Sequence, residues 1–175
     1  KQAAATGLLF ATVWLCATFW WLYVSMHTFA GLNAALTVLA IVALAMALGA
    51  YYAIACNLYW RLHQRGRWLS TLAFAALWTM AEMARGTWLT GFGWGAVGYA
   101  HADGPLAAWI PWVGSYGVGF LAAWVSAAGL AVVRSGGAVH SGWAMRLVLV
   151  LVMAVVPGLG LWVPGLLPVW STPAG

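Results

Sequence analysis

The sequence predicts an all-α protein, a polytopic bundle of about five membrane-spanning helices with one glycine-rich loop. The first observation is composition: 65% of the 175 residues are hydrophobic and 5% are charged, whereas soluble domains carry roughly 25% charged residues. The second is length, because the apolar runs approach the roughly 20 residues that cross a hydrocarbon core. The third is pattern: the runs lack the alternation of barrel strands, and a helix satisfies its own backbone groups inside a membrane.

Five apolar runs, bounded by charged or turn residues, are the predicted spans. They are about Thr6–Tyr23, Leu36–Trp60, Trp68–Met83, Leu106–Val133 and Leu147–Val163. Residues 1–163 are therefore expected to form a transmembrane helical domain. Residues 164–175 are rich in proline and glycine, and we expect them to form an exit towards a further domain.

The basic residues predict the orientation of the helices. Arginines lie between the second and third predicted spans, at 61–67, and flank the connection between the fourth and fifth, at 134–146. By the positive-inside rule both loops are cytoplasmic, which puts loops 24–35 and 86–105 and the C-terminus on the opposite side. The seven basic residues form no continuous face, so the net charge of +5 does not predict nucleic acid binding.

Residues 90–105, TGFGWGAVGYAHADGP, interrupt the hydrocarbon-rich sequence with glycines and polar groups. Trp94 and Tyr99 lie among these glycines instead of at the start of an apolar run. Loop backbone is tolerated at membrane depth only where protein covers it or it lines a cavity. The segment therefore predicts one wall of a lipid-accessible chamber, formed by a loop or by a re-entrant segment. Its glycines do not predict a dinucleotide site, because no strand precedes them.

Glu82 and Arg85 are three residues apart at the end of the third predicted span, so they share one face of a helix. Ionisable side chains near membrane depth indicate a function by default. Two interpretations stay open. The pair either anchors the helix end at the headgroups or contacts a substrate.

Other residues favour ordinary structural roles. Cys16 and Cys56 lie inside apolar runs without the electropositive setting that a catalytic thiolate needs, so we expect them to pack. The four histidines show no metal-ligand spacing, and neither a metal nor another cofactor is expected. Small residues in the fourth span are expected to permit close helix approach, namely Gly114, Gly117 and Gly119.

Two segments resemble the bacterial apolipoprotein N-acyltransferase family. The first is similar to the family pattern E-x-x-R-G…TGFPW…GY, and it comprises EMARG at 82–86, TGFGW at 90–94, GY at 98–99 and the following DGPL at 103–106. The second, WLYVSMHTFAG at 21–31, is similar to the family segment W-x-Y-V-S…TFGG. The chain departs from the pattern at Gly93, where the family usually has proline. Glycine leaves the loop conformation less predetermined than proline does.

The resemblance implies an enzyme of the bacterial inner membrane. Such enzymes transfer an acyl chain from a phospholipid to the α-amino group of the diacylglyceryl-cysteine of a lipoprotein. The reaction passes through a thioester on a cysteine, with a glutamate as base and a lysine that stabilises the oxyanion. That trio belongs to a nitrilase-like domain facing the periplasm. The only lysine here is Lys1, so no catalytic residue can be carried over, and we expect this part alone to be inactive.

The same resemblance implies that this part holds lipid substrates and anchors the catalytic domain. The expected partners are a phospholipid acyl donor, a lipoprotein acceptor and membrane lipids. The residues expected to contact lipid are Trp94, Tyr99, Glu82, Arg85, Phe92, Trp21 and Tyr23. Loops 24–35 and 86–105 and the C-terminus would then be periplasmic.

Three alternatives stay open. The chain could be a non-catalytic lipid-binding membrane module, or a transporter-like bundle in which the glycine-rich loop is only a packed turn. A transporter is expected to carry internal repeats and midplane polar sites, and the sequence shows neither. The third alternative is a related membrane domain fused to a glycosyltransferase. The sequence that flanks these residues would discriminate among them.

Overall fold

The computed structural model describes residues 1–62, 67–89 and 91–134, together with positions 150, 154, 155 and 158. Every regular element in these ranges is a helix, which confirms the all-α prediction. The chain divides into two compact units, Lys1–Ala96 and Val97–Gly175. The predicted boundary between residues 163 and 164 lies outside the described residues.

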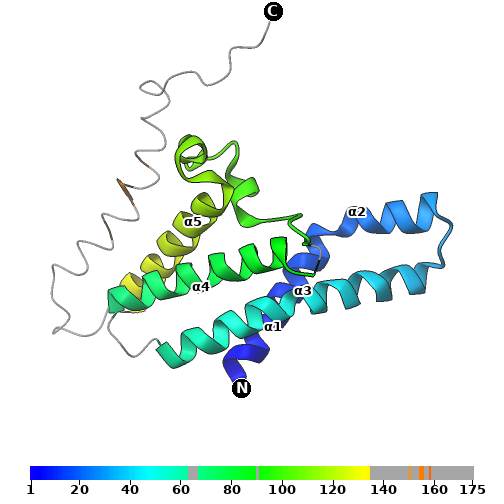
Figure 1. Ribbon diagram of the computed structural model, residues 1–175, viewed down its shortest axis with the longest axis horizontal. Helices are drawn as coiled ribbons and strands as arrows, with labels where there is room; N and C mark the ends of the chain where they lie inside the picture. The colour runs from blue at the N-terminus through cyan, green and yellow to red at the C-terminus, as the bar shows by residue number, and fades with distance from the viewer. Residues whose placement is uncertain (63–66, 90, 135–149, 151–153, 156–157, 159–175) are drawn as a thin grey trace, which may run out of the picture. The chain divides into compact units, whose positions relative to one another are not determined.

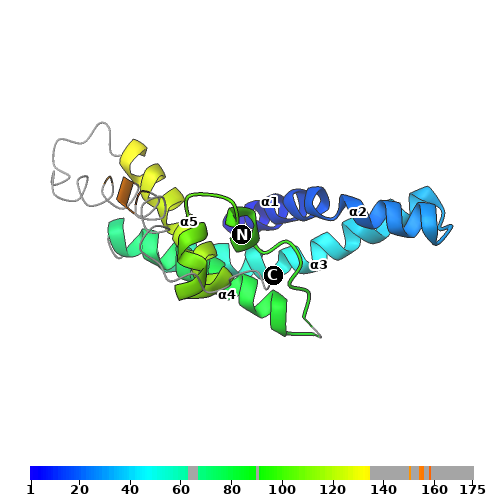
Figure 2. The same ribbon diagram turned by 90° about the horizontal axis from the view of Figure 1, so that it is seen from above.

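The first unit begins with a bent helix. Helix α1 (Gln2–Thr18) ends at Phe19, and the chain continues through α2 (Trp20–Tyr23) into the π-helical segment η1 (Val24–Phe29). The two parts meet at 57°. The bend is visible in Figure 1, whereas the two parts look nearly in line from above in Figure 2. The hydroxyl of Thr18 donates a hydrogen bond to the Trp14 carbonyl, 2.9 Å away, a side-chain bond of the type that bends helices. The first predicted span is therefore broken near its end, and helix extends into the predicted connection at 24–35.

Helix α3 (Ala34–Leu62) runs antiparallel to this bent helix (Figure 1). The side chain of Asn33 caps its start, because its Oδ1 accepts a hydrogen bond from the Ala35 amide at 2.9 Å. Helices α1 and α3 approach closely at a glycine on each. A Cβ added at Gly7 would lie 2.7 Å from the Cys56 sulfur, and one added at Gly49 would lie 3.2 Å from side chains of α1. Small residues thus allow α1 and α3, which correspond to the first and second predicted spans, to approach closely.

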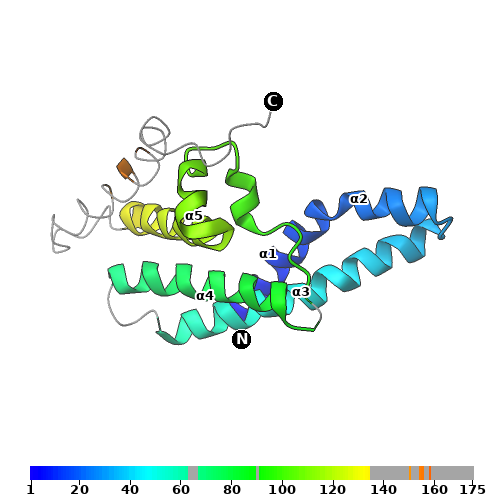
Figure 3. The same ribbon diagram turned by 45° about the horizontal axis from the view of Figure 1, so that its top comes forward.

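Helix α4 (Arg67–Thr87) packs antiparallel along α3 (Figure 3). Aromatic rings join the three helices: the ring centroid of Tyr52 lies 4.8 Å from that of Trp78 and 5.7 Å from that of Trp14. Near the start of α4, the hydroxyls of Tyr59 and Ser70 are hydrogen-bonded at 3.0 Å. The core of the first unit is therefore aromatic as well as aliphatic.

Within the described ranges, fewer spans are found than the sequence predicts. Two helical stretches are long and apolar enough to cross a membrane, α3 and Ala107–Ala131, and the bent helix adds a third if it counts as one span. Helix α4 occupies the predicted third span but is not among them, which fits its charged residues at 67, 82 and 85. The predicted fifth span lies almost entirely outside the described residues. Five spans are therefore not confirmed.

The described part of the second unit consists of two short 3₁₀ helices, η3 (Val97–His101) and η4 (Ala107–Trp109), and helix α5 (Ile110–Arg134). Gly114 interrupts α5 with φ 67° and ψ 179°. Its role in close helix approach was predicted wrongly, because a Cβ added there would meet nothing within 4 Å. Glycine is used here for its left-handed backbone conformation. Close contacts in this unit are at Gly98, where an added Cβ would collide with the Ser115 carbonyl, and at Gly117, where it would collide with the Val113 side chain.

Candidate functional site

The predicted site in the first unit is built on the chain reversal that ends α4. The Phe92 amide donates to the Arg85 carbonyl at 2.8 Å, and the Gly91 amide donates to the Trp88 carbonyl at 3.0 Å. Gly91 has φ 70°, and an added Cβ would collide with the Gly86 carbonyl. Only glycine fits this position without displacing the loop. Leu89 also adopts a positive φ of 52°, which costs energy for a residue with a side chain.

The side chain of Arg85, on α4, holds this loop by hydrogen bonds. Its Nη1 donates hydrogen bonds to the carbonyl oxygens of Phe92 at 2.7 Å and Trp94 at 2.8 Å. Bonds from an ionised donor are stronger than neutral ones. The side chain is 1% exposed, and its Nε and Nη2 are buried without a hydrogen bond in the described part of the chain. In this conformation Arg85 faces protein backbone and offers no surface to a ligand.

Glu82 and Tyr52 complete the buried polar group around Arg85. Glu82 is 1% exposed and Tyr52 is fully buried. The Tyr52 hydroxyl lies within electrostatic reach of both the carboxylate of Glu82 and the guanidinium of Arg85. The sequence places Glu82 and Arg85 on one helix face, and the structure does so too. The participation of Tyr52 was missed, because a tyrosine within an apolar span 30 positions before Glu82 gives no local signal.

The aromatic residues of the loop lie against the bend between α1 and α2. Phe92 packs edge-on against Phe19, with ring centroids 5.1 Å apart. Trp94 and Trp21 pair at 5.7 Å, and these two indoles are 64% and 39% exposed. A Cβ added at Gly95 would meet the Thr18 side chain at 2.5 Å, so the loop backbone lies close to the bend. The loop thus presents an accessible indole pair above a buried charged group.

The structure brings six of the seven predicted lipid-contacting residues into the first unit. Tyr23 lies one turn beyond the bend, where its ring is 5.1 Å from that of His27. Tyr99, 63% exposed, belongs to η3 in the second unit. Trp88 is 66% exposed in the same loop but pairs with Tyr51 at 6.3 Å, so it does not belong to the Trp21–Trp94 pair.

The accessible large side chains of this loop are hydrophobic, and two of them are indoles. No group of three histidine, cysteine or acidic side chains among them could hold a metal ion. Cys16 and Cys56 are unpaired and half-buried within α1 and α3. Exposed indoles, by contrast, suit a boundary between apolar and wet surroundings. The accessible surface of the site is therefore formed by two adjacent indole faces.

These observations define a class, a helical membrane protein with an aromatic loop held at a helix bend. Residues 1–128 match the family model described as Apolipoprotein N-acyltransferase N-terminal domain. The chain belongs to this family, as its motifs predict.

Relatives agree with this assignment. The chain is 51% identical to the apolipoprotein N-acyltransferase of Verminephrobacter eiseniae over 122 residues, which cover 70% of this chain and 23% of that protein. It is 39% identical to that of Ralstonia nicotianae over 161 residues, covering 81% and 31%. A putative apolipoprotein N-acyltransferase of Bordetella parapertussis is 36% identical over 187 residues, covering 100% and 34%. The chain thus spans a quarter to a third of the length of these curated relatives.

Proposed function

We propose that this chain is the membrane portion of an apolipoprotein N-acyltransferase. The full enzyme transfers an acyl chain from a phospholipid to the α-amino group of the diacylglyceryl-cysteine of a lipoprotein. This portion holds the lipid substrates and anchors the catalytic domain. Family membership supports an acyltransferase over the transporter-like and glycosyltransferase alternatives.

The observation that carries the lipid-holding role is the accessible pair of Trp21 and Trp94. Their rings come from segments more than 70 positions apart and meet at 5.7 Å while staying exposed. Two adjacent indoles give a large, rigid apolar surface with polar N–H groups, which suits the boundary between acyl chain and headgroup. Phe92 and Tyr23 are proposed as further lipid contacts in the same unit, and Tyr99, in the second unit, is proposed as a lipid contact of its own.

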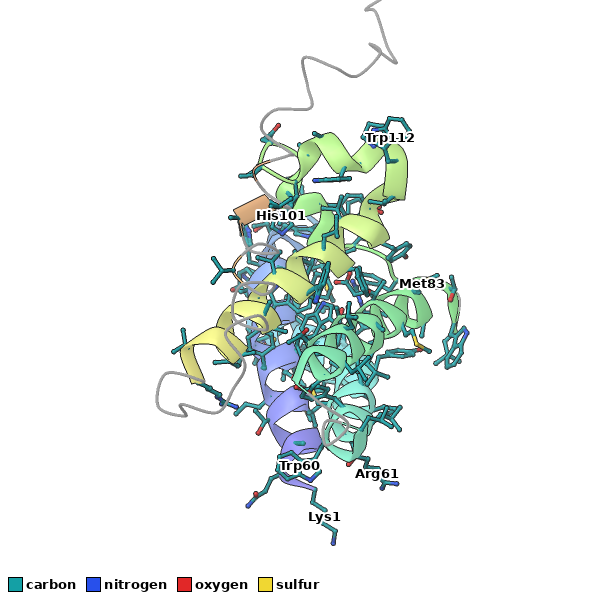
Figure 4. All side chains as sticks on the ribbon, turned by 90° about the vertical axis from the view of Figure 1, so that its left-hand side faces the viewer. Lys1, Trp60, Arg61, Met83, His101 and Trp112 are labelled. Carbon is teal, nitrogen blue, oxygen red and sulfur yellow. The ribbon has the colours of Figure 1, made fainter. Side chains whose placement is uncertain are left out.

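The chemistry itself is proposed to use a glutamate, a lysine and a cysteine of a nitrilase-like domain in the full-length protein. Residues 1–175 contain a single lysine, at position 1. Lys1 lies near Trp60 and Arg61 at one end of the first unit (Figure 4). Met83, near the C-terminal end of α4, lies away from them. This part alone is therefore proposed to be inactive.

The proposed location is the bacterial inner membrane, with loops 61–67 and 134–146 cytoplasmic. The shared end of Lys1 and Arg61 supports this orientation, because basic residues collect on the cytoplasmic side. The loop after α4 lies at the far end of that helix. Loops 24–35 and 86–105 and the C-terminus are then periplasmic, on the side proposed for the catalytic domain.

Replacing Trp94 in the full-length protein tests the proposed role. We expect Trp94→Ala to lower kcat/KM for acyl transfer from phospholipid by about tenfold, which corresponds to about 1.4 kcal/mol of lost contact. Trp88→Ala is the matched control, because Trp88 is equally exposed in the same loop but pairs with Tyr51 instead of Trp21. Equal activities of the Trp94 variant and the wild type would overturn the role of the indole pair.

A further inference from the structure

Arg85 holds the backbone on both sides of residue 93. Its Nη1 bonds the carbonyls of Phe92 and Trp94, and its own carbonyl accepts the Phe92 amide. Three hydrogen bonds therefore connect one residue of α4 to two loop residues, Phe92 and Trp94.

These three hydrogen bonds, called the clamp from here on, determine where the rings of Phe92 and Trp94 lie. With the carbonyls of 92 and 94 fixed, the Phe92 ring packs against Phe19 and the Trp94 ring lies beside Trp21. Removing the clamp would free the backbone that carries Trp94. Arg85 itself is only 1% exposed, so its effect on a ligand would pass through that backbone. Misplacing a binding group by about 1 Å can cost a large factor in rate.

We infer that Arg85 is a positioning residue, which sets the place of the Trp94 indole for the lipid substrate and does not touch that substrate. Glu82 and Tyr52 are buried near its guanidinium, and the hydrogen bonds of that guanidinium go to two backbone carbonyls of the loop. This assigns the conspicuous charged pair of the sequence to the support of the aromatic surface. The activity test of this inference rests on the proposed function, whereas the hydrogen-exchange test is independent of it.

The structural test is hydrogen exchange in the full-length protein. Arg85→Lys keeps the charge near Glu82 but loses the planar fork that a guanidinium presents. We expect backbone amides of residues 91–96 to exchange about tenfold faster in this variant, since the loss of the side-chain bonds to the carbonyls of Phe92 and Trp94 loosens the loop and exposes its amides more often. Arg61→Lys, at an exposed position at the other end of α3, is the control and should change nothing there. Unchanged exchange in Arg85→Lys would overturn the inference.

The functional test is a double-mutant cycle with Trp94. Arg85→Lys is expected to lower kcat/KM for the phospholipid donor by about tenfold, mainly through KM, in the presence of Trp94. In the Trp94→Ala background the same change should cost less than about twofold, because the residue that it positions is gone. Equal costs in both backgrounds would show that Arg85 contacts the substrate itself.

A second variant keeps the test decisive if Arg85→Lys does not fold. Gly91→Ala displaces the loop from its other side, because its Cβ would collide with the Gly86 carbonyl while Arg85 is retained. It should reproduce the faster exchange and the dependence on Trp94. If Trp94→Ala alone did not change activity, the proposed lipid-holding role would be wrong. Hydrogen exchange would still decide whether Arg85 positions the loop.

Discussion

The glycine-rich stretch is held in two different ways along its length. In the first unit, Gly91–Ala96 depends on the side chain of a charged residue, because Arg85 bonds the carbonyls of Phe92 and Trp94. In the second unit, Val97–His101 packs by the absence of a side chain, because Gly98 lies directly against the Ser115 backbone. Neighbouring segments of similar composition should therefore respond to different perturbations, the first to loss of charge and the second to added volume.

The largest expected effect is loss of the charge. Arg85→Leu removes both carbonyl bonds and leaves the buried Glu82 without the opposite charge that shares its helix face, and removing one of two buried opposite charges typically costs about 3–5 kcal/mol. We expect the free energy of unfolding of the full-length protein to fall by that amount. Chemical denaturation in detergent measures it, with Arg61→Leu as an exposed control that should change stability by less than about 0.5 kcal/mol. A wild-type value for Arg85→Leu would show that the charge does not hold the first segment.

Added volume should act on the second segment. A valine at position 98 would force its side chain into the Ser115 carbonyl, and overpacking of this kind costs about 1–3 kcal/mol. Gly104→Ala is the control, because the nearest atom to its added Cβ is 3.7 Å away. Denaturation of both variants checks the prediction. Equal stability of Gly98→Val and Gly104→Ala would mean that the close contact is not needed.

A smaller effect is expected at Trp21, the less exposed member of the indole pair. Losing an aromatic pair is worth about 0.5–1.5 kcal/mol, so Trp21→Ala should raise KM for the phospholipid donor by roughly twofold to tenfold. Trp20→Ala is the neighbouring control, since Trp20 is 67% exposed but belongs to no such pair with Trp94 in the described structure. Similar KM values for the two variants would separate the pair from the proposed lipid contact.

The sequence predicts the helices better than their interruptions. Long apolar runs predict α3 and the helical state of α4, because hydrophobic length and charge placement are local properties. The break at Phe19 was missed, since apolar residues continue through it, and the Thr18 hydrogen bond and the distant loop that lie beside it leave no mark in the apolar pattern. Gly114 was misassigned because a glycine in an apolar run suits both close packing and a left-handed break.

The candidate site was predictable in its residues but not in its division of roles. The motif residues around 82–94 were all singled out, because charges and glycines are conspicuous in an apolar chain. Their burial was not predictable, since it depends on where the loop folds back over α4. The exposed Trp94 and the buried Arg85 are nine residues apart, yet one hydrogen bond joins the side chain of one to the backbone of the other.

The smallest effect is expected at Gly93, the position where the family usually has proline. Gly93 has no left-handed φ, and a Cβ added there would meet nothing within 4 Å. Arg85 holds the carbonyls on both sides of it, so the loop shape does not depend on the residue between them. Gly93→Ala should leave stability within about 0.5 kcal/mol of the wild type, or raise it slightly by restricting the unfolded chain.

Gly91→Ala, two positions earlier, should be clearly less stable in the same denaturation experiment, because its Cβ collides with the Gly86 carbonyl and its φ is 70°. If Gly93→Ala were as damaging as Gly91→Ala, the loop would depend on flexibility at residue 93, and the clamp by Arg85 would not be what determines its shape.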